Sequence, residues 1–89
     1  MMNREQFFQK LEREGYPQPV EVLREPNGFL TDHTHPFEVI ALIISGSIEL
    51  TVEGVTNHYQ PGDIFHLKHE QLHSEAYGPN GVHYLAARK

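Results

Sequence analysis

The 89-residue sequence contains no cysteine. The chain therefore forms no disulfide, no thiolate metal site and no cysteine nucleophile. Basic residues are also scarce, because seven Lys and Arg stand against twelve Asp and Glu, for a net charge of −5. Nucleic-acid binding needs a basic surface, so we expect no nucleic-acid partner.

Long apolar segments are missing as well. The first ten residues are polar and lack the apolar core of a signal peptide. The longest apolar run, residues 39–44, has six residues, whereas a helix that spans a bilayer needs about twenty. We therefore expect a soluble, cytoplasmic protein with no membrane partner. A chain of 89 residues has room for one compact core, which excludes two-domain enzymes.

Residues 1–15 are predicted to form a short helix. Asn3 is a suitable N-cap, and Gln6 stands three residues later, as a capping box requires. A single helix of this length cannot shield its apolar side chains from water by itself. We expect it to pack on the rest of the domain or on a dimer partner. Its apolar stripe consists of Phe7, Phe8 and Leu11.

Residues 16–89 have the pattern of short strands. Turn signals recur about every eight to twelve residues, which is typical of an all-β sandwich or barrel. We expect strands at residues 20–22, 29–35, 39–44, 48–52, 64–67 and 82–87, with a turn at Ser45 and Gly46.

The strand at residues 39–44 is apolar at every position, so both of its faces should be covered. One face can look into the barrel, and the other should meet a partner sheet or a second copy of the chain. Together with the apolar stripe of the helix, this pattern favours a homodimer with twofold symmetry.

His33-Thr34-His35 is the first motif with a chemical meaning. Residues two apart on a strand point to the same side, so both imidazoles would lie side by side, as a metal requires of two ligands. The chain contains seven histidines, and a pair at this spacing can also arise by chance.

A second motif, Gly62 to His73, supports a functional role for the first motif. Gly46 stands eleven residues after His35, and His73 stands eleven residues after Gly62. Both spacings resemble the two signatures of the cupin superfamily, whose members are small double-stranded β-helix (jelly-roll) barrels. The resemblance extends from about residue 20 to the C-terminus. It implies a jelly-roll barrel that follows the N-terminal helix, with metal ligands at His33, His35 and His73.

One position departs from the family pattern. Cupins carry a Glu four residues after the second histidine of the first signature, and here Val39 occupies that position. The nearest acid is Glu38, which strand parity points away from the histidines unless a bulge beside Pro36 turns it inward. Glu38 is therefore a candidate fourth ligand and Val39 a candidate pocket residue. His83, on the last predicted strand, is a further candidate for the pocket.

Three neutral imidazoles suit a divalent transition metal such as Zn, Ni, Fe, Mn or Cu. Such a site keeps coordination positions open for water or a substrate. The resemblance implies two classes of function. The first is a metal-dependent enzyme of the dioxygenase, isomerase or decarboxylase type that acts on a small molecule. The second is a non-catalytic module that binds or senses a small molecule or a metal, because a fold does not determine a function.

Overall fold

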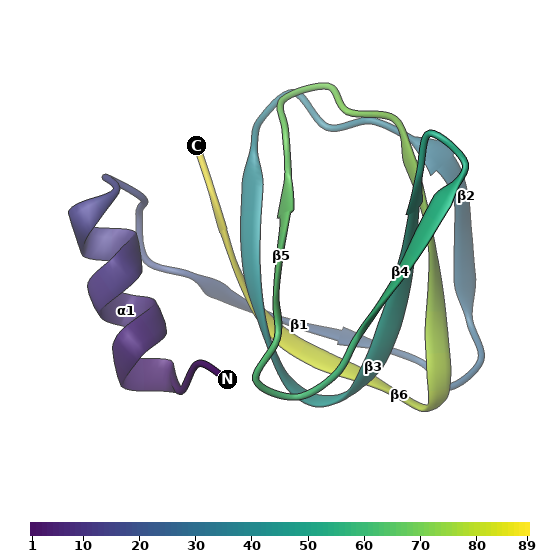
Figure 1. Ribbon diagram of the computed structural model, residues 1–89, viewed down its shortest axis with the longest axis horizontal. Coiled ribbons are helices and arrows are strands. Elements are labelled where there is room, and N and C mark those ends of the chain that lie inside the picture. The colour runs from purple at the N-terminus through teal and green to yellow at the C-terminus, as the bar shows by residue number, and fades with distance from the viewer.

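The computed structural model describes all residues 1–89 and contains one helix and six strands (Figure 1). The strands form one antiparallel sheet that closes into a double-stranded β-helix, which confirms the all-β class with a short N-terminal helix. The elements are α1 (Arg4–Arg13), β1 (Val20–Arg24), β2 (Phe29–His33), β3 (Val39–Val52), β4 (Val55–Tyr59), β5 (Ile64–Leu67) and β6 (His73–Arg88). The structure contains no helix with the length and apolar character needed to cross a membrane.

The two long strands, β3 and β6, form a central ribbon. They pair along most of their length, from Val39 opposite Arg88 to Thr51 opposite Ser74. Strands β1 and β2 pair with different parts of the outer edge of β6. Strands β4 and β5 pair with different parts of the outer edge of β3. The ribbon bends, so that the two ends of the sheet close around a common interior (Figure 1).

The bend lies at the predicted turn, but the strand does not end there. The pairing of β3 with β6 shifts between Ile43 and Ser45 and again between Gly46 and Ile48, which marks two irregularities in one continuous strand. Gly46 has a φ of 74°, and a Cβ there would collide with the carbonyl oxygen of Gly81 on β6. The predicted turn is therefore wrong, because the glycine lets the strand bend while its pairing resumes.

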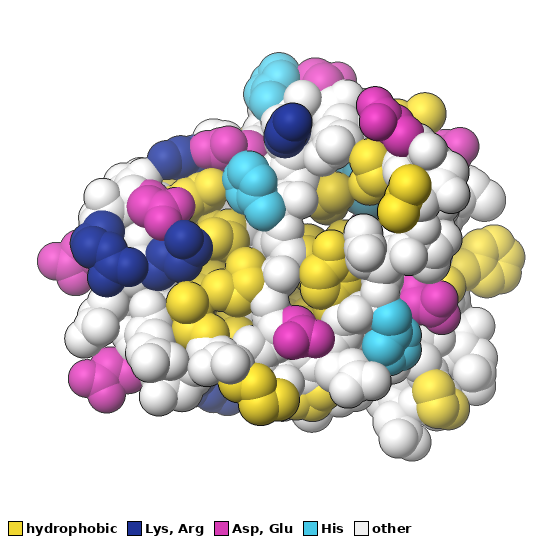
Figure 2. All heavy atoms as spheres, in the orientation of Figure 1, with side chains coloured by type: hydrophobic (Ala, Val, Ile, Leu, Met, Phe, Trp, Pro, Cys, Tyr) yellow, Lys and Arg dark blue, Asp and Glu magenta, His cyan; other side chains and the backbone are white.

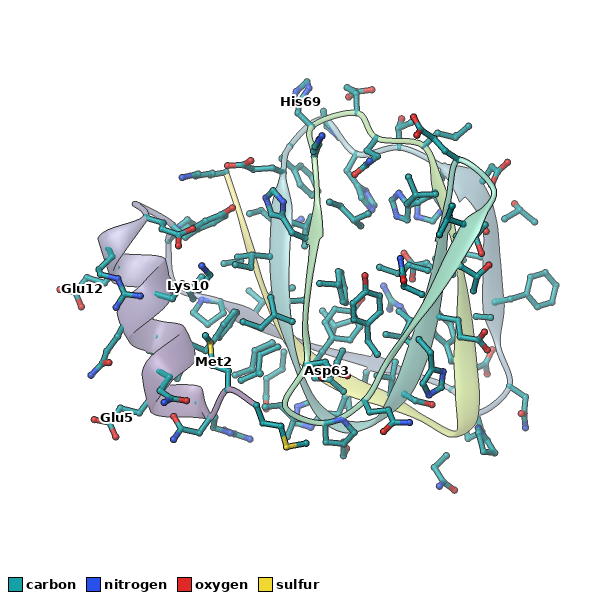
Figure 3. All side chains as sticks on the ribbon, in the orientation of Figure 1. Met2, Glu5, Lys10, Glu12, Asp63 and His69 are labelled. Atoms are coloured by element: carbon teal, nitrogen blue, oxygen red, sulfur yellow. The ribbon has the colours of Figure 1, made fainter.

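The helix covers the outer face of β3. Phe7 and Leu11 are buried, whereas the polar residues Glu5 and Glu12 point away from the barrel (Figure 3). Apolar side chains fill the space between the helix and the barrel (Figure 2). The buried residues of this outer cluster are Phe7, Leu11, Ile40, Leu42, Leu85 and Ala87.

A separate cluster of 11 buried residues, from Val39 to Ala86, fills the inside of the barrel. Both faces of residues 39–43 are thus covered, and α1 supplies the outer cover within the same chain. The capping box predicted for the helix is present: the N–H of Gln6 donates to Asn3 Oδ1 at 2.9 Å, and the N–H of Asn3 donates to Gln6 Oε1 at 3.0 Å.

Candidate metal centre

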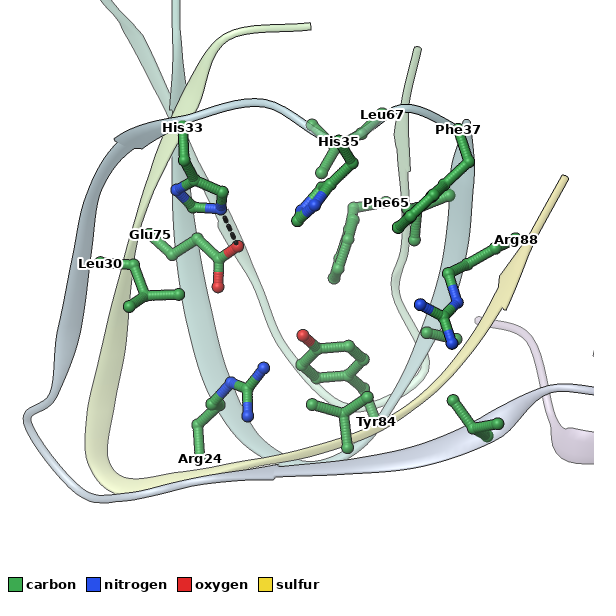
Figure 4. Close-up of a pocket in the computed structure, with 14 residues that line it drawn as sticks. Arg24, Leu30, His33, His35, Phe37, Phe65, Leu67, Glu75, Tyr84 and Arg88 are labelled. Carbon is green, nitrogen blue, oxygen red and sulfur yellow. Dashed lines mark ion pairs between the residues drawn. The ribbon is translucent and has the colours of Figure 1, made fainter. Parts of the chain in front are cut away.

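Three histidines and one glutamate meet inside the barrel: His33, His35, His73 and Glu75 (Figure 4). One potential ligand atom from each lies within 4.8 Å of the others. The imidazole centroids of His33 and His73 are 4.2 Å apart, and that of His35 is 5.1 Å from each. A group of this composition and spacing could hold a metal ion.

The pairing of β2 with β6 brings most of the group together. His33 and His73 are direct cross-strand partners, and Glu75 follows His73 by two residues, so its side chain leaves the same face of β6. His35 lies beyond the end of β2, although residues 29–35 were predicted as one strand. Its ring stacks on Phe37 with centroids 5.1 Å apart and planes 9° from parallel, and this contact holds it toward the other rings.

Backbone carbonyls determine which ring nitrogen of two histidines faces the centre. His33 Nδ1 lies 2.7 Å from the carbonyl oxygen of Thr31, and His73 Nδ1 lies 2.9 Å from that of Gln71. A carbonyl oxygen only accepts, so each Nδ1 donates, and a neutral ring then carries a lone pair at Nε2. Metal-binding histidines are commonly oriented in this way, with the other ring nitrogen donating to a backbone carbonyl or a carboxylate.

Both Nε2 atoms are buried and make no hydrogen bond. Each nevertheless lies 3.3 Å from Glu75 Oε2. Two lone pairs aimed at an anionic oxygen repel it, so the arrangement needs either protons on the rings or a cation between the three atoms. The donor set of imidazole nitrogens and a carboxylate oxygen fits a divalent transition metal.

Tyr77 orients the carboxylate of Glu75. The hydroxyl of Tyr77 donates to Glu75 Oε1 at 3.0 Å, which leaves Oε2 to face the two rings. Burial, reinforced by the negative charge of Glu75, raises the pKa of Tyr77 well above its ordinary value. The hydroxyl therefore stays protonated and remains a hydrogen-bond donor at neutral pH.

The environment of His35 favours its neutral form. Burial lowers the pKa of His35, and the neighbouring His73 and His33 lower it further. A neutral imidazole is the form that binds a metal, so His35 is suited to complete the group with the two rings above.

A cavity of about 200 Å³ adjoins the group (Figure 4). Most of its lining is apolar, with Val39 and Phe65 among the contributing residues. The ring of Tyr84 lies in the cavity wall with its hydroxyl directed inward (Figure 4). Burial, followed by the charge of Glu75, raises the pKa of Tyr84 to about 12, so this hydroxyl is a neutral donor at neutral pH.

Two other candidate residues lie elsewhere. Glu38 stays outside the group, because its backbone pairs with Lys89 in both directions and its carboxylate lies 3.5 Å from His66 Nε2 and 3.7 Å from Lys89 Nζ. No bulge turns it toward the histidines. His83 lies on the face of β6 opposite Tyr84, with Nε2 3.1 Å from Glu21 Oε1, and does not line the cavity.

Glu75 is the member of the group that the sequence reasoning missed. The available signal was its position two residues after His73, which places it on the same face if both residues belong to one strand. The predicted last strand began only at residue 82, whereas β6 begins at His73.

Comparisons with known proteins agree with this architecture. A family model described as "Cupin domain" matches residues 20–76, and no curated protein matches the chain in sequence. KdgF from Halomonas sp. is 22% identical with a TM-score of 0.65, and the match covers 81% of this chain and 69% of that one. An uncharacterised protein with a double-stranded β-helix domain from Klebsiella pneumoniae is 26% identical with a TM-score of 0.65, covering 80% and 66%.

A larger protein contains the same fold. A variant of oxalate decarboxylase from B. subtilis is 21% identical with a TM-score of 0.71, and the match covers 80% of this chain but only 20% of that one. The chain thus spans between a fifth and about two thirds of the lengths of these three structures.

Proposed function

The chain belongs to the cupin family, and on that premise we propose that it binds a divalent transition metal and acts with it on a small molecule. The proposed ligands are His33, His35, His73 and Glu75. The observation that carries the proposal is the pair of buried, unpartnered Nε2 atoms that face Glu75 Oε2 at 3.3 Å. Zn, Ni, Fe, Mn and Cu all accept this donor set, and the donor set alone does not choose between them.

The proposed centre borders the cavity, because His33, His35 and Glu75 are part of the cavity wall. A metal bound there would supply Lewis-acid or redox chemistry to a small molecule in the cavity. The chain itself would contribute a largely apolar wall around that molecule, and the neutral hydroxyl of Tyr84 can donate a hydrogen bond to one of its oxygens. This supports an enzyme of the dioxygenase, isomerase or decarboxylase type.

One observation favours the alternative of a non-catalytic binding or sensory module. Outside the proposed ligands, the cavity wall contains no carboxylate and no further histidine, and the pKa of Tyr84 is raised to about 12, so no group there is suited to proton transfer near neutral pH. A module that binds a small molecule without converting it needs no such group. Conversion of a small molecule into a product by the metal-loaded chain would identify an enzyme, and binding without conversion would identify a module.

Exchange of one carboxylate for an amide tests the ligand assignment. We expect Glu75→Gln to weaken cobalt(II) or zinc binding at least about tenfold, because the amide keeps the shape of the side chain but loses its charge. Glu38→Gln is the matched control and should bind as the natural chain does, since Glu38 lies outside the group. Competition with a chromophoric chelator measures both affinities, and circular dichroism verifies the fold.

Two results would contradict the proposal. One is equal metal affinity in Glu75→Gln and the natural chain. The other is a larger loss in Glu38→Gln than in Glu75→Gln, which would place the carboxylate ligand on the segment before β3.

A further inference from the structure

We propose that the cavity beside the metal centre binds a small organic acid, and that Arg24 and Arg88 hold its carboxylate. The inference rests on the proposed function, because it names the class of molecule on which the centre would act. It depends, however, on two residues outside the ligand group, and so can be tested apart from metal binding.

The two arginines come from different elements and line one cavity. Arg24 ends β1, Arg88 ends β6, and both contribute to the wall that includes His33 and Glu75. Figure 4 shows both guanidinium groups directed toward the space around the Tyr84 ring. The guanidinium of Arg88 also lies over the ring of Phe37, 5.0 Å from its centroid, which limits where this side chain can move.

Neither arginine has an acidic partner. The ion pairs of the chain engage Lys10, Lys89 and histidines, and none includes Arg24 or Arg88. The chain has twelve acidic side chains against seven basic ones, so two unpaired arginines at the same cavity do not reflect a shortage of carboxylates. A guanidinium presents parallel N–H donors in a plane, which matches the two oxygens of a carboxylate.

The other residues of the cavity wall indicate the polarity and size of the rest of the ligand. Nine of the 14 lining residues are hydrophobic, among them Leu30 and Phe65. These side chains suit an apolar body rather than a sugar or another densely polar molecule. A volume of about 200 Å³ is below the ~300–1,000 Å³ of pockets for drug-sized ligands, so the ligand is small.

The wall favours a carboxylate over a phosphate. Phosphate sites commonly use the backbone N–H groups at a helix N-terminus, and α1 contributes no residue to this cavity. The carboxylate of Glu75 also lies in the wall, and it repels a doubly charged phosphate more strongly than a singly charged acid. With a divalent ion at the centre, the sum of charges around the cavity is positive and attracts an anion.

The test compares two probes of nearly identical shape, benzoate and neutral benzamide. Each is titrated into the zinc-loaded protein and into protein treated with a chelator, and dissociation constants are read from amide chemical shifts in NMR spectra. We expect benzoate to bind at least about tenfold more tightly than benzamide to the zinc-loaded chain. The double variant Arg24→Gln, Arg88→Gln should lose that preference.

A matched double variant controls for the change in net charge. Arg4→Gln with Arg13→Gln removes two arginines from α1, away from the cavity, and should keep the preference for benzoate. If the cavity double variant is unstable, Arg24→Gln alone leaves the stacking of Arg88 on Phe37 intact, and should still weaken benzoate binding severalfold.

Three results would overturn the inference: benzoate binding no better than benzamide, benzoate binding unchanged in the cavity variants, or inorganic phosphate binding more tightly than benzoate. Failure of the metal centre looks different. In that case zinc does not bind, whereas benzoate in the chelator-treated protein still requires Arg24 and Arg88. If zinc binds but the arginine substitutions leave benzoate binding unchanged, the organic-acid inference is rejected and the metal centre is not.

Discussion

Tyr77 connects the core of the barrel to the candidate metal centre through a single hydrogen bond. Its hydroxyl holds Glu75 Oε1, so its removal should loosen the carboxylate without altering a ligand. We predict that Tyr77→Phe weakens zinc affinity about tenfold, as is typical when a hydrogen bond to a metal ligand is removed. Tyr59→Phe is the control, because the Tyr59 hydroxyl makes no hydrogen bond to the group. Equal zinc affinity in the two variants, measured by competition titration, would show that Tyr77 does not position Glu75.

Three of the four grouped side chains could be predicted from the sequence. The fourth, Glu75, could not, because the family pattern places the acid at the position that Val39 occupies. The spacing of His33, His35 and His73 carries the resemblance to cupins and needs no structure. The family pattern directed attention to the acid nearest Val39, which is Glu38. In the structure Val39 does line the cavity, and the carboxylate comes from Glu75 on β6 instead.

At the scale of elements, α1 packs against the barrel through Phe7, whereas Phe8 of the same apolar stripe faces outward. Phe7 is fully buried against the outer face of β3 and β6, whereas Phe8 is 41% exposed. We predict that Phe7→Ala lowers the free energy of unfolding by about 3–5 kcal/mol, as for other buried phenylalanines. Phe8→Ala, one residue away, should cost about 1 kcal/mol or less. Denaturant unfolding measures both, and equal losses would mean that α1 does not dock through Phe7.

The positions of most strands could be predicted from alternation and turn signals, but their continuity could not. The sequence predicts a turn at Gly46 and a last strand that begins only after Gly81, and both glycines have a positive φ in the structure. A hairpin turn and a bend within a strand place the same demand on the backbone. Only the partner strand distinguishes them: Gly46 pairs with Val82, so β3 continues and β6 runs beside it from His73 to Arg88.

At the scale of the whole molecule, one chain contains two apolar layers separated by one sheet. The inner layer fills the barrel, and the outer layer lies under α1. The sequence pattern favoured a homodimer because residues 39–44 and the helix stripe both needed cover, and here they cover each other. A homodimer stays a prediction, and the exposed side chains of Leu23 on β1 and Phe29 on β2 are among the apolar residues that a partner could cover. Light scattering would give the mass in solution.

The central claim is that the three histidines and Glu75 form a metal centre. The most direct test is elemental analysis of the chain purified without a histidine tag, beside the double variant His33→Ala, His73→Ala. We predict a near-stoichiometric transition metal in the natural chain and none in the variant, because the variant lacks both buried Nε2 atoms. No metal in the natural chain, even after incubation with divalent ions, or equal metal in both proteins, would contradict the account.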